Sequence, residues 1–305
     1  MLSEKNKTMG AMLVCLAATL WGFDSIVLTP RLFKLSVPYV VFMVHLLPFI
    51  GMTLIFGKDE IKNVKKLDKR DLMFFFLVAL FGGSLGTLSI VKALFLVNFH
   101  HLTVVTLLQK LQPVFAIILA RIILKEREGK GFLFWAVMAL IGGYLLTFQF
   151  NMPQMVYNGN MLLACFYALL AAFSFGSATV FGKRILKNAS FRTALYLRYG
   201  LTTFIMFFIA SFTGSFSYIS HTTPVQWLIF GIIGLTSGSG AILLYYKGLR
   251  YIKANVATMC ELCFPVSSIL FDYIFNGNVL STIQILSAVL MLYSIYKITK
   301  NRANE

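Results

Sequence analysis

Three ionisable side chains stand inside long apolar stretches of this sequence and are the first candidates for chemistry. Asp24 lies in the first such stretch, Lys110 in the fourth and Glu261 in the ninth. A charged group surrounded by hydrocarbon is unfavourable, so each should face a polar cavity or an ionic partner. An acid and a base in one cavity would bind a zwitterion, such as an amino acid or a related amine, by its opposite charges.

Lys110 belongs to a polar helix face. Thr106, Lys110 and Pro113 recur at spacings of three to four residues, and Gln109 flanks them. One interpretation is that Lys110 binds a carboxylate or phosphate of a substrate. The alternative is a structural ion pair with Asp24.

Glu261 occupies the matching place in a later stretch, with Thr258 one turn before it. It would bind a cationic group of the substrate or carry a coupling proton. The alternative is a structural role, in which Glu261 pairs with a lysine or with backbone groups.

Aromatic residues accompany the acidic ones. Trp21 precedes Asp24 by three residues, and the two would hold an ammonium group by cation–π and ionic attraction. A structural role, with Trp21 packing and Asp24 binding a lysine, remains open. Tyr245 and Tyr246 end the eighth apolar stretch, where they would line a gate or anchor the helix at the membrane interface.

Two prolines, Pro113 and Pro265, lie inside apolar stretches. Proline removes a helical hydrogen bond, so each should kink its helix and shape a cavity, or serve as a purely structural kink.

The composition indicates that these residues lie in a membrane. Of the 305 residues 58% are hydrophobic and only 12% are charged, more apolar side chain than a soluble protein of this length can bury. We expect an all-α protein whose transmembrane helices span residues 9–29, 38–57, 72–95, 102–122, 131–150, 160–182, 193–213, 225–246, 254–275 and 280–298.

The net charge of +16 does not indicate a nucleic-acid partner, because the basic residues lie in loops between apolar stretches. Most of the 27 Lys and Arg fall on one side if both termini are cytosolic. Each half, residues 1–150 and 151–305, then contains five helices. An odd number of helices per half requires the second half to be inverted.

An internal repeat supports this division. Residues 79–128 match 234–280, with Gly83-Ser84 corresponding to Gly238-Ser239. Inverted repeats of this kind surround a central binding site in membrane carriers.

Several motifs resemble a known family. Trp21-Gly22 in the first helix, the Gly- and Ser-rich third and eighth helices, and Leu108-x-x-x-x-Pro113 followed by Leu124-Lys125-Glu126 are similar to the ten-helix drug/metabolite transporter superfamily with two EamA domains. The resemblance implies a cavity lined by the first, third and fourth helices of each half. It also implies alternating access and movement of a small polar metabolite across the cell membrane.

The sequence has no Walker-type phosphate loop and no recognisable Ser-His-Asp or metal-ligand constellation, so we expect a carrier without cofactor or metal rather than an enzyme. The alternative is a membrane enzyme or flippase acting on a lipid-linked or phosphorylated metabolite. The expected partners are the substrate and the lipid bilayer, with protons or a counter-substrate as the energy source. The protein would act as a monomer or a homodimer.

Overall fold

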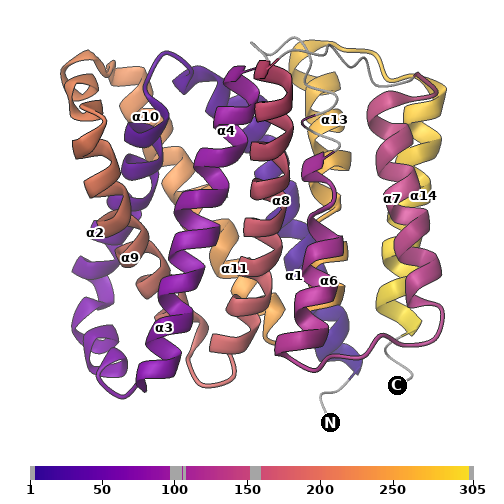
Figure 1. The fold of residues 1–305 in the computed structure, drawn as a ribbon, viewed down its shortest axis with the longest axis horizontal. Coiled ribbons are helices and arrows are strands. Elements are labelled where there is room, and N and C mark those ends of the chain that lie inside the picture. Colours follow the sequence, from indigo (N-terminus) through magenta and orange to yellow (C-terminus); the bar gives the residue numbers. More distant parts are fainter. Residues whose placement is uncertain (1–3, 97–104, 106–107, 152–158, 302–305) are drawn as a thin grey trace.

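A computed structural model describes residues 4–96, 105, 108–151 and 159–301. All regular elements of this part of the chain are helical, and the helices run side by side along one common direction (Figure 1). Eight of its helical segments are long and apolar enough to cross a membrane, and two shorter apolar helices, α6 and α7, accompany them. The expected all-helical membrane class is therefore confirmed.

In the first half, short π-helical and 3₁₀ turns interrupt or follow several of the α-helices. They are α1 (Glu4–Phe23), the π-helical turn η1 (Asp24–Leu28), the 3₁₀ turn η2 (Thr29–Leu32), α2 (Val37–Val64), α3 (Lys69–Val78), the π-helical turn η3 (Ala79–Leu85), α4 (Gly86–Leu96), α6 (Gln112–Ile123) and α7 (Phe132–Phe148).

The second half has a similar order. Its elements are α8 (Gly159–Ile185), α9 (Phe191–Phe212), the 3₁₀ turn η4 (Ser215–His221), α10 (Pro224–Ile233), the π-helical turn η5 (Gly234–Gly238), α11 (Ser239–Leu249), α12 (Ala254–Cys260), α13 (Cys263–Asn276) and α14 (Thr282–Asn301).

The helices pack in matching pairs across the two halves. Helix α1 lies against α11 and α13, and α8 lies against α4 and α6. Helix α2 pairs with α9, and α7 pairs with α14 at one side of the molecule (Figure 1). The first helix of each half is therefore enclosed by elements of the other half, and the core lies between them.

Small residues permit the close contacts in this core. A Cβ atom at Gly22 of α1 would overlap the Ser267 hydroxyl of α13, and one at Gly83 of η3 would overlap Thr202 of α9. Close approach of backbones at Gly is a common way for membrane helices to gain packing contacts.

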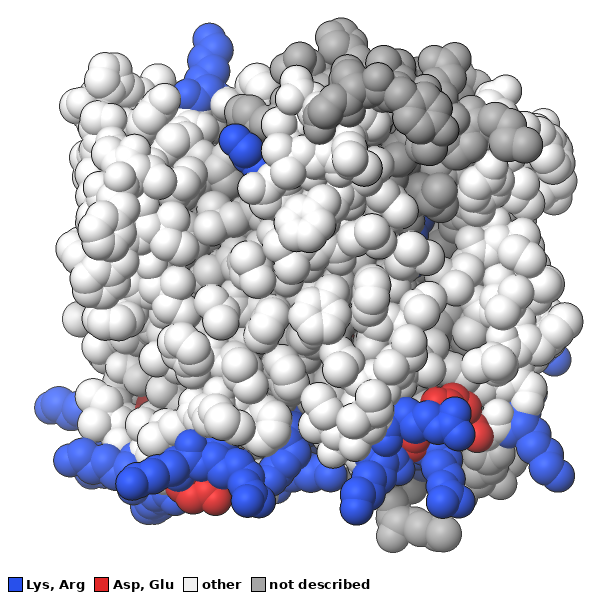
Figure 2. Space-filling model, in the orientation of Figure 1, with Lys and Arg blue, Asp and Glu red and all other residues white. Residues whose placement is uncertain are grey.

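Charged side chains are distributed unequally between the two ends. Lys and Arg gather at the end where α1 begins and α14 ends, and few appear at the opposite end in this view (Figure 2). We call the first of these the basic end. The short connection between α2 and α3, residues 65–68, contributes to it, and there Asp68 caps α3 by accepting the Asp71 N–H.

Candidate functional site between the two halves

Two membrane-spanning segments are interrupted at corresponding places. A turn at Lys110 and Leu111 precedes α6, and a turn at Glu261 and Leu262 separates α12 from α13. In each turn the leucine N–H bonds to the carbonyl three residues earlier, at 3.1 Å in both cases. Ionic side chains therefore stand at both interruptions.

Each interruption is followed by a proline in the first turn of the next helix. Pro113 is the second residue of α6, and Pro265 is the third residue of α13. Proline is tolerated at such positions, because the N–H it lacks has no helical partner there in any case.

Glu261 is surrounded by neutral hydrogen-bond donors from three helices. Its Oε1 accepts the Tyr245 hydroxyl of α11 at 2.8 Å and the Thr179 hydroxyl of α8 at 3.1 Å, and its Oε2 accepts the Gln112 amide of α6 at 2.6 Å. Neither a lysine nor the backbone supplies these three bonds. The carboxylate is therefore bound by side chains from both halves.

Aromatic rings adjoin this carboxyl group. The Trp21 ring of α1 lies 5.6 Å from that of Tyr245, and the indole N–H donates to the Ser237 carbonyl in η5 at 3.0 Å. Tyr245 and Tyr246 are both buried, which excludes the interfacial anchoring considered for them. Trp21, Tyr245 and Glu261 thus form a polar and aromatic group of residues, here called the central cluster.

Lys110 and Asp24 do not join each other. The Lys110 ammonium donates to the Gly143 carbonyl at 3.0 Å and to the Thr147 hydroxyl, both on α7. Asp24 opens η1 and accepts the Thr29 hydroxyl at 3.0 Å. The ion pair suggested as an alternative is thus not formed. Arg184 and Asp71, both away from these two residues, form an ion pair at 3.8 Å.

The remaining expected residues take different positions. Thr258 is buried on α12, and its hydroxyl has no hydrogen-bond partner within the described residues. The side-chain amide of Asn255, one turn earlier, is also buried and also has no partner among them. Gln109 is half-buried just before the first interruption. Thr106 lies outside the described residues.

Arg198, Thr179 and Gln112 are site residues that were not predicted from the sequence. Arg198, in α9, donates to the Tyr246 hydroxyl and to the Gly82 carbonyl, each at 3.2 Å. Its position inside an apolar stretch is the same signal that singled out Lys110. Thr179 and Gln112 carry no charge, and nothing in their sequence context distinguishes them.

Carboxylates of the first half bind the second half at the basic end. Glu126 accepts the backbone N–H groups of Ala254 at 3.0 Å and Asn255 at 3.3 Å, and so caps α12. Glu60 accepts the Thr193 hydroxyl at 2.7 Å. Asp71 accepts the amide of Asn188, and together these contacts close the basic end between the halves.

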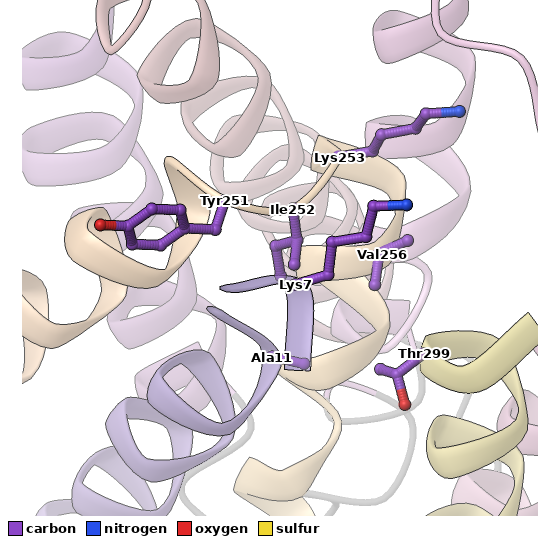
Figure 3. A pocket seen from close by; sticks show the side chains of 7 residues that line it. All are labelled: Lys7, Ala11, Tyr251, Ile252, Lys253, Val256 and Thr299. Carbon is purple, nitrogen blue, oxygen red and sulfur yellow. The ribbon is translucent and has the colours of Figure 1, made fainter. Parts of the chain in front are cut away.

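A separate pocket opens at the basic end between α1, α12 and α14 (Figure 3). The two lysine side chains at its rim extend in the same direction in this view, and the Lys253 ammonium donates to the Arg127 carbonyl at 3.2 Å. This basic-end pocket is lined by Lys7, Ala11, Tyr251, Ile252, Lys253, Val256 and Thr299. No residue of the central cluster lines it.

The part of the chain that the structure describes contains no group of three or more His, Cys, Asp or Glu arranged to hold a metal ion. Its four cysteines are free thiols, and Cys260 and Cys263 are buried.

The sequence profile of the EamA-like transporter family matches the chain twice, over residues 8–148 and 162–300. The chain belongs to the EamA-like transporter family. It is accordingly a multi-pass transporter of the cell membrane and not an enzyme.

Individual relatives agree with this membership. The chain is 69% identical over 295 residues to a protein of Fusobacterium nucleatum subsp. nucleatum named riboflavin transporter ImpX, covering 97% of this chain and 99% of that one. It is 26% identical over 260 residues to an uncharacterized transporter of Synechocystis sp., covering 83% and 73% of the two chains. A solved structure with 14% identity superposes with a TM-score of 0.74, covers 97% of this chain and 98% of that chain, and shares the fold.

Proposed function

We propose that this EamA-like transporter carries riboflavin across the cell membrane. The observation that carries the proposal is the 69% identity, over nearly the full length of both chains, to a protein named riboflavin transporter. The central cluster provides suitable chemistry for such a solute.

Riboflavin joins a flat aromatic ring system to a chain of hydroxyl groups. Trp21, Tyr245 and Tyr246 would contact the rings, because aromatic pairs favour stacked or edge-to-face packing. Buried hydrogen-bonding groups on α12 would bind the hydroxyls. Thr258 and Asn255 are suited to this role, because their buried polar atoms lack partners among the described residues.

A zwitterionic amino acid is less well supported as the substrate. That expectation required Asp24, Lys110 and Glu261 to share one cavity. The ammonium of Lys110 instead bonds to α7. Thr106 and Gln109, expected beside Lys110, are therefore weaker candidates than Trp21 and Tyr245.

We propose alternating access as the mechanism, with ten transmembrane helices arranged as two inverted repeats, residues 1–150 and 151–305. The matched packing of α1 with α11 and α13, and of α8 with α4 and α6, supports this arrangement. The gathering of Lys and Arg at the basic end supports cytosolic termini. Opening toward the cytosol would then break the Glu126 cap on α12 and the Glu60–Thr193 bond.

Glu261 is the candidate for coupling to protons, because it is the carboxyl group that both halves bind. Exchange against a counter-substrate is the other source of energy for a carrier. Asp24, at the start of η1, lies in the same first helix as Trp21 and is the second acidic candidate.

The test is uptake by proteoliposomes containing the purified protein. We expect uptake of radiolabelled riboflavin to be stimulated by unlabelled riboflavin on the opposite side. Uptake of an amino acid but not of riboflavin would restore the zwitterion hypothesis. A covalent change in the substrate, or movement of a lipid-linked or phosphorylated compound alone, would favour the membrane enzyme or flippase.

A further inference from the structure

Arg198 is a half-buried cation held only by neutral groups. Its Nη1 donates to the Tyr246 hydroxyl and its Nη2 to the Gly82 carbonyl, each at 3.2 Å. Its guanidinium carbon lies 5.8 Å from the centre of the Tyr246 ring. The Nε–H group is buried and has no hydrogen-bond partner within the described residues.

No carboxylate of the described residues forms an ion pair with Arg198. Glu261 is not an ion-pair partner of Arg198, because its oxygens bond to Tyr245, Thr179 and Gln112. Ionisable groups inside membrane segments without a direct counter-charge commonly mark the path of a substrate.

The π-helical turns η3 and η5 differ in the side chain that donates a hydrogen bond to one of their carbonyl oxygens. In η5 the Ser237 carbonyl accepts the neutral indole N–H of Trp21, and in η3 the Gly82 carbonyl accepts the charged guanidinium of Arg198. Turns of this kind shift the helical hydrogen-bond register and are frequent at functional sites. The neutral donor belongs to the Trp21–Tyr245 ring pair, and the cation contacts the neighbouring Tyr246.

We infer that Arg198 forms a subsite for the hydrogen-bond-accepting edge of a flat, aromatic, dione-bearing substrate, with the rings of Tyr246 and Tyr245 leading to it. This inference rests on the proposed riboflavin transport. At the pyrimidine-dione of a flavin, the C4 carbonyl oxygen and the adjacent unprotonated ring nitrogen N5 are two hydrogen-bond acceptors in one plane, whereas the nitrogen between the two carbonyls is an N–H donor. A planar guanidinium matches such paired acceptors better than a lysine ammonium does.

The arrangement orients the solute. Tyr245 and Tyr246 are consecutive, with ring centres 5.9 Å apart, and they connect Arg198 to Glu261 and Trp21. A flavin whose dione edge meets Arg198 would direct the rest of its ring system toward Trp21. Arg198 is thus a specificity-determining residue that distinguishes dione-bearing rings from other tricyclic aromatics.

The experiment compares three ligands by titration calorimetry on the purified full-length protein in nanodiscs. Riboflavin and lumichrome contain the dione edge, whereas phenazine has three fused rings without it. We expect Arg198→Gln to weaken riboflavin and lumichrome binding by about ten- to hundredfold, the effect of losing hydrogen bonds from a charged donor, and to leave phenazine binding unchanged. Arg192→Gln, at an exposed position of the same helix, is the matched control and should bind all three as the wild type does.

Arg198→Lys provides a second variant in case the glutamine variant does not fold. It keeps the charge but loses the planar pair of donors, so the preference for riboflavin over phenazine should still fall. An unchanged preference in either folded variant, or an equal loss for all three ligands, would overturn the subsite. Failure of the wild type to bind riboflavin would instead contradict the proposed function.

Discussion

The interruptions before α6 and between α12 and α13 share a backbone design but use their ionic residues differently. Lys110 turns toward α7 at the side of the molecule, where it bonds to Gly143 and Thr147. Glu261 turns into the interior, where three neutral donors surround it, Tyr245 and Thr179 from its own half and Gln112 from the other. The interruption at Lys110 therefore attaches the peripheral helix α7, whereas the interruption at Glu261 contributes to the central cluster.

A one-residue difference in register between the two repeats explains why the ionic side chains contact different neighbours. When the repeats are aligned on Pro113 and Pro265, Glu261 corresponds to Gln109, and Lys110 corresponds to Leu262. One residue along a helix rotates the side chain by about 100°. Lys110 and Glu261 therefore leave their segments in different directions, although both occupy an interruption.

The largest effect should come from Glu261→Gln. Loss of the charge weakens its hydrogen bonds and removes a carrier of protons, so riboflavin uptake should fall by at least about tenfold and lose its dependence on a pH gradient. Uptake by proteoliposomes at several imposed gradients measures both. Unchanged uptake with unchanged pH dependence would exclude Glu261 as the coupling group.

Tyr245→Phe should have a smaller effect. It keeps the ring beside Trp21 but removes the hydroxyl that donates to Glu261, a bond whose loss should reduce riboflavin affinity by about three- to tenfold. Equilibrium binding measures the change. Tyr251→Phe, at the basic-end pocket, is the control and should bind riboflavin with wild-type affinity. A larger loss of affinity for Tyr251→Phe than for Tyr245→Phe would mean that riboflavin binds in that pocket.

Lys110→Met should leave riboflavin binding within about twofold of the wild type, roughly 0.4 kcal/mol. The reason is that both partners of Lys110 belong to α7 and neither belongs to the central cluster. The same binding assay applies. A tenfold loss of affinity would mean that the two interruptions act alike and that Lys110 contacts the substrate.

Lys62→Cys should not change transport at all but tests the orientation of both halves. This exposed position lies at the end of α2, in the basic end. An impermeant thiol reagent should label it only after the cells are opened, whereas Lys34→Cys, exposed beyond η2, should be labelled in intact cells. The reverse pattern would reject cytosolic termini.

Much of the architecture could be predicted because it follows from local chemistry. Apolar stretches predicted the membrane class, and the repeated Gly83-Ser84 and Gly238-Ser239 pairs coincide with or adjoin the π-helical turns η3 and η5. The shortness of α6 was not predicted, because hydropathy does not reveal where a membrane helix is interrupted. Nor does hydropathy reveal that Glu126, which belongs to the Leu124-Lys125-Glu126 motif, caps α12.

The sequence by itself determined that this chain lies in lipid, that its halves resemble each other, and that Glu261 and Lys110 stand inside membrane segments. Those properties depend on composition and spacing along the chain. Which polar groups contact one another depends on the tertiary structure. Thr179, Gln112 and Tyr245 come from three separate helices and Glu261 from the turn between α12 and α13, and the direction of each side chain depends on helix rotation and on the place of each interruption. A shift of one residue sends a side chain to a different neighbour, so no one-dimensional pattern contains that information.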